Sequence, residues 1–350
     1  MGCVALICLK IHREKSRVMI SDNISFDHLK YCVGPLLYMP ALRNDIAEKI
    51  ISFKKYKPVS IAICLEDTIR DDMVRDAEKN MAEQIKILSD MMAESGSYDD
   101  LPLVFIRVRS PWQIAAVIDM LGENISLVCG FILPKIDDIV FSEYVSEIVK
   151  IKRAGNDFCY MPIIENASLL SLKTRYDKLQ RLHDMMAALR DCILNIRVGG
   201  NDFSGSLAIR NSISQTVYDI IPVADLLSDI AVTFTGDYVV SAPVWNYFDN
   251  GTDHRWRDGL SREMILDRSM GFVGKTVIHP SQIPVVIENM KVSRQDLRDA
   301  RLILDTADND LQVIKSTEGN RMYEHKVHRK WAERIIEIAS VYGAEKDREL

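Results

Sequence analysis

Eight short apolar runs, most of them rich in β-branched residues, recur along this chain, and amphipathic helical stretches separate most of them. The runs are Leu36–Met39, Ser60–Leu65, Leu103–Val108, Leu127–Leu133, Tyr160–Ile164, Ile193–Val198, Tyr238–Ser241 and Thr276–Ile278. Apolar strands that alternate with helices are typical of βα units, whose strands are parallel and buried. Eight such units in a chain of 350 residues predict the α/β class and a (β/α)₈ TIM barrel.

Two of the intervening stretches carry clear helical patterns. Thr68–Glu94 places apolar residues every three or four positions, which is one face of a helix. The methionines of that face are interpreted as core packing, because such stripes are far more often core than binding surface. Asn44–Lys55 begins on an Asn-Asp signal for a helix N-cap.

The eight units end near residue 290, yet further helix signals follow. Ser293 is expected to cap a helix to about Ala307, and His325–Tyr342 is expected to form a second helix with an apolar face. The prediction is therefore a leader at 1–35, a TIM-barrel domain at 36–290 and a C-terminal helical extension at 291–350.

The apolar face of the extension must be covered. We expect it to pack on a neighbouring subunit of a homo-oligomer or to close over the barrel rim. The alternative is that it folds back on its own barrel.

Charge and cysteine usage exclude some classes of function. The net charge of −6 argues against nucleic acid as a partner, because binding it requires a basic excess. The apolar run Cys3–Leu9 is too short to span a membrane. Seven cysteines lie far apart with no CxxC pair, which suits free thiols in a reducing compartment. The chain is predicted to be a soluble cytoplasmic protein.

Charged side chains stand where four of the predicted strands end. They are Glu66 and Asp67, Arg107 with Arg109 beyond it, Glu165, and Asp202. In a TIM barrel these strand ends share one rim, where catalytic groups gather. Glu165 and Asp202 offer the hard oxygen ligands that Mg²⁺ prefers, and Mn²⁺ could replace it. The alternative is that Glu165 pairs with a basic residue and that Gly199–Asp202 is only a turn.

The cations of the rim also allow two interpretations each. Arg107 could hold a substrate carboxylate with a two-pronged hydrogen bond, or it could pair with Glu66 or Asp67. Lys135, at another strand end, could bind substrate or form a rim ion pair. His279 follows the last strand and is interpreted as structural, because Pro280 fixes the turn beside it. No Ser/His/Asp order, P-loop or Rossmann glycine motif is present.

Seven segments match one family in order. They are LYMPALRNDIAEKI at Leu37–Ile50, ICLEDTI at Ile63–Ile69, IRV at Ile106–Val108, ILPKID at Ile132–Asp137, PIIEN at Pro162–Asn166, VGGNDF at Val198–Phe203 and GFVGKTVIHPSQI at Gly271–Ile283. Together they resemble the citrate lyase β-subunit-like branch of the 4-hydroxy-2-oxoacid aldolase/citrate lyase superfamily. Within that branch the chain resembles a bacterial subgroup of TIM-barrel C–C bond lyases associated with tellurite-resistance gene clusters. The resemblance covers roughly residues 36–290.

The resemblance implies a (β/α)₈ barrel and Mg²⁺-dependent chemistry at a C–C bond next to a carbonyl. It implies Glu165 and Asp202 as metal ligands and Arg107 as the residue that binds the substrate carboxylate. It also implies that Glu66 and Asp67 form the acidic pair beneath the metal. Either a water or this pair could move the proton. The substrate-binding set is completed by Gly199, Gly200, Asn201, Lys135 and Arg43.

The chain also departs from the family. Asn201 stands where the family often has Glu, and Pro40–Arg43 lacks the catalytic His of the aldolase branch, which leaves the general base unidentified. The aromatic-rich stretch Trp245–Trp256 differs from the citrate lyase version, so a citryl thioester is not the expected substrate.

The expected function is a Mg²⁺-dependent C–C lyase of aldol or Claisen type that acts on a 2-oxoacid or acyl-thioester-like substrate. Participation of coenzyme A stays open. The alternatives are a non-catalytic metabolite-binding or scaffolding barrel, and an enzyme that handles a nucleotide sugar with the same metal.

Overall fold

The computed structural model describes residues 25–96, 101–306 and 313–345. The chain divides into two compact units, Met1–Val286 and Ile287–Leu350. Most of the predicted leader lies outside the described residues. The described end of that stretch forms helix α2 (Phe26–Cys32), which Ser25 caps by accepting a hydrogen bond from the His28 N–H at 3.1 Å.

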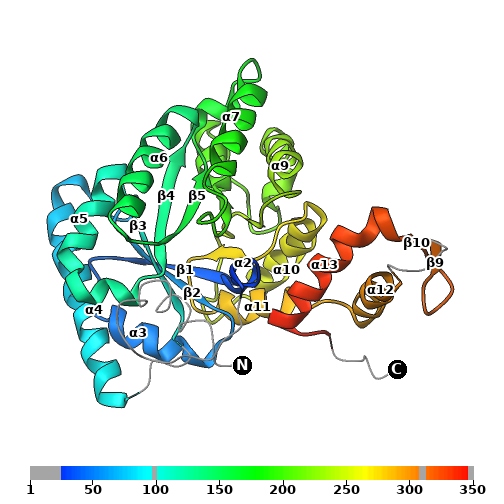
Figure 1. The fold of residues 1–350 in the computed structure, drawn as a ribbon, viewed down its shortest axis with the longest axis horizontal. Helices are drawn as coiled ribbons and strands as arrows, with labels where there is room; N and C mark the ends of the chain where they lie inside the picture. Colours follow the sequence, from blue (N-terminus) through cyan, green and yellow to red (C-terminus); the bar gives the residue numbers. More distant parts are fainter. Residues whose placement is uncertain (1–24, 97–100, 307–312, 346–350) are drawn as a thin grey trace. The chain divides into compact units, whose positions relative to one another are not determined.

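The first unit is a barrel of eight parallel strands (Figure 1). The strands are β1 (Pro35–Pro40), β2 (Ser60–Cys64), β3 (Leu103–Arg107), β4 (Gly130–Ile136), β5 (Cys159–Ile164), β6 (Ile196–Val198), β7 (Val240–Ser241) and β8 (Lys275–Val277). Neighbours in the chain are neighbours in the sheet, and β8 pairs with β1. A parallel bridge between Ala242 and Lys275 closes the ring. The TIM-barrel prediction is confirmed, with strand ends shifted by a few residues.

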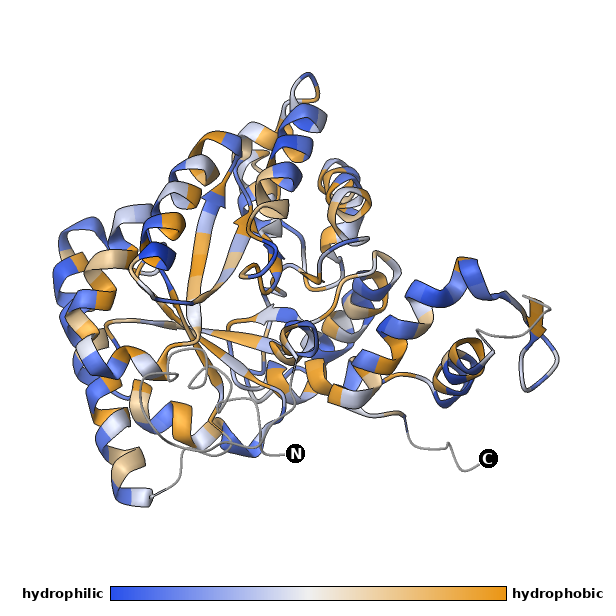
Figure 2. Cartoon of the chain, in the orientation of Figure 1, coloured by the Kyte–Doolittle hydropathy of each residue, from blue (hydrophilic) through white to orange (hydrophobic). Residues whose placement is uncertain are grey.

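Helices cover the outside of the strands. They are α3 (Ile46–Ser52), α4 (Val74–Ser95), α5 (Pro111–Leu121), α6 (Asp138–Arg153), α7 (Arg175–Ala187), α8 (Gly200–Ser206), α9 (Ile221–Phe234), α10 (Arg255–Ser269) and α11 (Gln282–Asn289). Figure 2 shows hydrophobic and hydrophilic colours alternating along these helices, as expected of elements with one face on a core. Met81, Ile85 and Leu88 of α4 are completely buried, so the methionine-containing stripe is core packing.

Two helix starts differ from the sequence prediction. Helix α4 begins at Val74 rather than Thr68, because Arg109 donates hydrogen bonds to the carbonyl oxygens of Leu65 and Ile69 and holds that loop out of helical geometry. Asp45 occupies the N-cap position of α3 but makes no capping hydrogen bond. Its carboxylate is instead bound by Arg43 at 2.6 and 2.8 Å.

A charged cluster lies in the interior between β8 and α10. The Lys275 side chain is completely buried, and its Nζ lies 2.9 Å from Oε1 of Glu263 and 2.7 Å from Oδ2 of Asp267. Tyr218 donates a hydrogen bond of 2.7 Å to the other oxygen of Asp267. Burial raises the pKa of Asp267 to about 6, although Lys275 opposes this. Lys275 therefore has a structural role and does not reach the pocket described below.

The second unit contains α12 (Arg294–Asp305), a hairpin of β9 (Val313–Lys315) and β10 (Met322–Glu324), and α13 (His325–Tyr342). Ser293 caps α12 by accepting the Asp296 N–H at 3.0 Å, as predicted. Tyr323 donates a hydrogen bond of 2.7 Å to the buried Asp299 of α12. Ile335 and Ile338 of α13 are buried. Because α12 and α13 pack on each other, part of the apolar face is covered within this unit.

The cysteines follow the prediction only in part. Cys32, Cys64, Cys159 and Cys192 are buried free thiols. Cys129 is disulfide-bonded, so the expectation of free thiols fails there, and Cys3 and Cys8 lie outside the described residues. Among the helices of the described ranges, none is both long enough and apolar enough to cross a membrane.

Candidate active site

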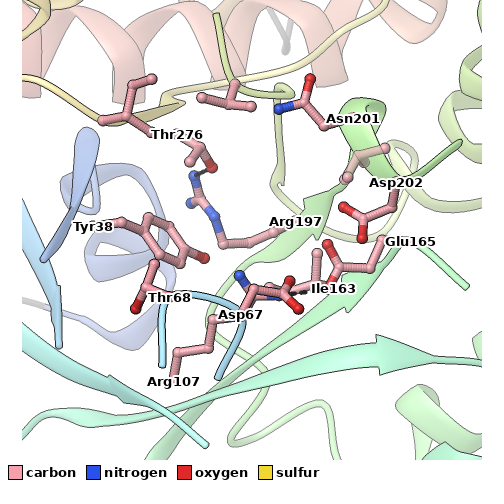
Figure 3. A pocket seen from close by; sticks show the side chains of 14 residues that line it. Tyr38, Asp67, Thr68, Arg107, Ile163, Glu165, Arg197, Asn201, Asp202 and Thr276 are labelled. Atoms are coloured by element: carbon pink, nitrogen blue, oxygen red, sulfur yellow. Dashed lines mark hydrogen bonds and ion pairs between the residues drawn. The ribbon is translucent and has the colours of Figure 1, made fainter. Parts of the chain in front are cut away.

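A cavity of about 370 Å³ opens among the carboxyl ends of the strands (Figure 3). Its lining consists of Tyr38, Asp67, Thr68, Arg107, Ile163, Glu165, Arg197, Val198, Gly199, Asn201, Asp202, Val244, Thr276 and Ile278. Most of the barrel strands, or the loops that follow them, contribute a residue. The charged strand ends predicted from the sequence therefore do meet at one rim, as the fold requires.

Arg107 links three carboxylates at the end of β3. Its Nη2 lies 2.8 Å from Oε2 of Glu66, 3.1 Å from Oδ2 of Asp67 and 2.9 Å from Oε1 of Glu165. Burial alone would lower the pKa of Arg107, but the carboxylates, above all Glu165, outweigh it and hold the pKa above the usual range. The ion-pair interpretation of Arg107 is thus correct. Its Nε is buried without a hydrogen-bond partner among the described residues, and Arg107 also lines the cavity.

Lys135 stands at an irregularity in β4 and reaches the same carboxylates. Its backbone is left-handed, with φ of 51°, which is uncommon for a residue other than glycine and is often found at functional sites. This conformation points its N–H at Oε1 of Glu165, 3.0 Å away. Its Nζ contacts Glu66 at 2.7 Å and also contacts Asp67. The predicted rim ion pair is therefore present.

Glu165 and Asp202 face each other across Gly199. A Cβ atom at position 199 would lie 2.5 Å from Oε2 of Glu165 and 3.2 Å from Oδ2 of Asp202, so both oxygens lie close to one point. In the described parts of the chain, neither Oε2 of Glu165 nor the Asp202 carboxylate accepts a hydrogen bond. Burial raises the pKa of Glu165 to about 8, and Asp202 adds to this rise while Arg107 opposes it.

Two unpartnered carboxylate oxygens beside one point fit a divalent cation, because it would offset both the burial and the mutual repulsion. Within residues 25–96, 101–306 and 313–345, no cluster of three or more His, Cys, Asp or Glu side chains is arranged for a metal. Glu165 and Asp202 would supply two ligands, and water and substrate the others, as is usual for Mg²⁺.

The glycines before Asp202 make room for protein atoms. Gly199 leaves space for the Glu165 side chain, and its N–H donates to the Ile164 carbonyl at 3.1 Å, so this amide is not free for a substrate. A Cβ at Gly200 would lie 3.0 Å from atoms of Pro243 and Val217. Asn201 lines the cavity and exchanges two hydrogen bonds, of 2.7 and 2.8 Å, with Asn246.

The remaining predicted residues lie beside the cavity. Glu66 is buried beneath its lining, where it holds Arg107 and Lys135. Arg43 is exposed, is paired with Asp45, and is not among the lining residues. His279 accepts the N–H of Ser281 and stacks on Phe248 with ring centroids 4.6 Å apart, which agrees with a structural role.

Sequence reasoning did not select Tyr38, Arg197 or Thr276. Arg197 is 1% exposed and donates a hydrogen bond of 2.7 Å to Oγ1 of Thr276. A signal existed, because a lone arginine inside an apolar strand run needs a polar environment. Tyr38 carried no comparable signal, since tyrosine is common in ordinary strands.

Comparison with known proteins gives three findings. The sequence matches the family described as C–C bond lyase of the TIM-barrel fold over residues 27–344. Mitochondrial citramalyl-CoA lyase of Homo sapiens is 26% identical over 284 residues, which are 78% of this chain and 76% of that protein. The Rattus norvegicus counterpart is 25% identical over 268 residues, which are 75% and 72% of the two chains.

Among solved structures, the protein CitE from Mycobacterium tuberculosis in complex with magnesium, acetoacetate and coenzyme A has a TM-score of 0.57 and 17% identity. The match covers 89% of this chain and 99% of that one. At this identity the likeness concerns the fold.

Proposed function

Because this chain belongs to the family of C–C bond lyases of the TIM-barrel fold and is a carbon–carbon lyase, we propose that its reaction depends on Mg²⁺ held by Glu165 and Asp202. The observation that carries the proposal is the pair of unpartnered carboxylate oxygens in the pocket, which lie 2.5 and 3.2 Å from the point that a Cβ atom on Gly199 would occupy. Mn²⁺ could take the same place.

The proposed substrate is a 2-oxoacid or an acyl thioester that carries a carboxylate. CitE was solved with magnesium, acetoacetate and coenzyme A, and the two mammalian relatives are named for citramalyl-CoA. A small-molecule substrate with a carbonyl next to the bond that breaks suits these names and the cation-lined pocket.

The residues around the proposed metal site have separate roles in catalysis. A bound Mg²⁺ would act as a Lewis acid for charge that develops on the substrate carbonyl oxygen. Arg107 orients the substrate carboxylate, which is a proximity effect. Glu66 holds Arg107 and Lys135 in place. Burial would raise the pKa of Asp67, but hydrogen bonds with Glu66 and Lys135 outweigh it and lower the pKa. Asp67 is therefore ionised at neutral pH and can accept the proton of a substrate hydroxyl.

Calorimetric titration tests the metal site. Wild-type protein is expected to bind Mg²⁺ at one site and then to bind oxalate, a mimic of an oxoacid enolate, only with Mg²⁺ present. Glu165→Ala is expected to lose both steps, because it removes one of two protein ligands. Glu143→Ala, at an exposed carboxylate of α6, serves as the control. Binding of Mg²⁺ by Glu165→Ala with wild-type affinity would refute the proposed ligand pair.

We also propose that the chain forms a homo-oligomer through residues 293–350. A chain ending at Val292 is expected to fall to a lower mass in light scattering, or to lose Mg²⁺-dependent activity if the segment covers the rim. If the number of subunits from light scattering is unchanged and the activity is intact, the segment is neither an assembly element nor a lid.

A further inference from the structure

Tyr38 brings a hydroxyl group into the pocket from strand β1. Figure 3 shows the tyrosine at the edge of the cavity, with its hydroxyl directed toward the space that Arg197 and Asp67 border. Within the described ranges this hydroxyl makes no hydrogen bond to the protein. A half-buried phenol with no protein partner is free to bond to a substrate.

Two arginines flank the tyrosine. The Cζ atom of Arg107 lies 5.6 Å from the centroid of the Tyr38 ring, and Arg197 lines the same cavity. Burial raises the pKa of Tyr38 to about 12, while the charges of Arg107 and Arg197 oppose this rise. The group is therefore a phenol at neutral pH, and two cations are placed to stabilise the phenolate that forms when it gives up its proton.

The other lining groups are poorer proton donors. Asp67 is held ionised by its ion pairs, and Glu165 and Asp202 are the proposed metal ligands. The Thr276 hydroxyl oxygen accepts a hydrogen bond from Arg197, and aliphatic hydroxyls are weaker acids than phenols. Among the residues that the structure describes, no histidine lines this cavity.

We propose that Tyr38 is the catalytic proton donor to the carbon atom that C–C cleavage of a 2-oxoacid substrate leaves as an enolate. This assignment rests on the proposed function. The substrate hydroxyl loses its proton to Asp67 and becomes a carbonyl, and the electron pair of the breaking C–C bond forms the enolate. The O–H bond of Tyr38 then breaks as its proton forms the new C–H bond. The phenolate recovers a proton from water and Asp67 releases its proton to water, so both residues return to their starting state. In the reverse direction the phenolate removes the same α-proton.

Exchange of the methyl protons of pyruvate in D₂O with Mg²⁺, followed by proton NMR, tests this step without the natural substrate. Tyr38→Phe is expected to slow exchange by about 100-fold or more, the usual range for a general acid or base. It is expected to keep wild-type affinity for Mg²⁺ and oxalate, because Tyr38 is not a proposed metal ligand and oxalate offers no carbon atom to protonate. An unchanged melting temperature would show that the fold is intact. Tyr176→Phe, at an exposed tyrosine of α7, is the control and is expected to exchange like wild type.

Exchange at the wild-type rate in Tyr38→Phe would overturn the assignment. A Tyr38→Phe variant that loses both oxalate binding and proton exchange would also overturn it, since the tyrosine would then position the ligand rather than transfer a proton. Wild-type protein that binds Mg²⁺ and oxalate but exchanges no faster than free Mg²⁺ would also remove Tyr38 as a donor while leaving the metal site standing. Wild-type protein that binds neither would refute the proposed function itself, and Tyr38 with it.

Discussion

Asp202→Asn is expected to melt at a higher temperature than wild type in the absence of divalent cations, and to gain no further stability when Mg²⁺ is added. At a pH of about 9, above the pKa of about 8 that burial gives Glu165, and without a cation, Asp202 and Glu165 place two charged carboxylates beside one point. Removing one charge should relieve repulsion on the order of 1–3 kcal/mol at the effective dielectric constant of a protein site. Wild type should instead gain roughly 2.7 kcal/mol at a Mg²⁺ concentration 100 times its dissociation constant.

Thermal melts of both proteins, with EDTA and with Mg²⁺, measure the melting temperature of each protein in the two conditions. Asp90→Asn, at an exposed carboxylate of α4, should respond to Mg²⁺ like wild type. A variant at position 202 that melts lower than wild type in EDTA and still responds to Mg²⁺ would contradict both the repulsion and the metal site.

Lys275→Met is expected to lower the free energy of unfolding by about 3–5 kcal/mol, the range found when one partner of a buried ion pair is removed. The methionine fills much of the same space but leaves Glu263 and Asp267 buried with no cation beside them. Burial raises the pKa of Asp267 to about 6, above its ordinary value of 3.8. Because this folded-state pKa is raised, the contribution of the carboxyl to stability is complete below its ordinary value of 3.8 and is lost as pH rises through about 6. Lys275 lowers this pKa, so above pH 6 the variant must either keep Asp267 protonated or bury its charge unpaired, whereas below that pH the carboxyl is protonated in both proteins. The deficit of the variant should therefore be larger at pH 7.5 than at pH 5.

Urea denaturation at the two pH values gives the loss of unfolding free energy in the variant and its dependence on pH. The triple variant Lys275→Met, Glu263→Gln, Asp267→Asn should recover part of the loss, because no unpaired charge remains. A deficit below about 1 kcal/mol in Lys275→Met, the scale of an exposed ion pair, would show that the cluster is better solvated than its burial indicates.

The barrel could be predicted from the sequence because its strands are buried and form continuous apolar runs between turn signals. Element ends were less accurate where side chains from distant segments decide them. Arg109 is the example, since its hydrogen bonds to Leu65 and Ile69 delay the start of α4. Nothing local to Thr68 indicates this.

The candidate site was predicted unevenly for a related reason. Charges at strand ends showed which residues reach the rim, and Asp67, Arg107, Glu165 and Asp202 do line one pocket. Local sequence could not show which partners each would choose. Gly199 illustrates the limit, because it makes room for Glu165, which lies 34 positions earlier in the chain. Tyr38 was missed because its role depends on the two arginines placed around it by other strands.

The left-handed backbone at Lys135 has a consequence for which cation the site prefers. It places an N–H on Oε1 of Glu165, the same oxygen that Arg107 binds. Only Oε2 then remains to meet an ion, so Glu165 can act as a one-oxygen ligand but not as a chelating one. Calcium in proteins is commonly coordinated by both oxygens of a carboxylate. The smaller magnesium ion is usually coordinated by one oxygen of each carboxylate and retains several water ligands. A single unusual peptide in β4 would thus discriminate against calcium.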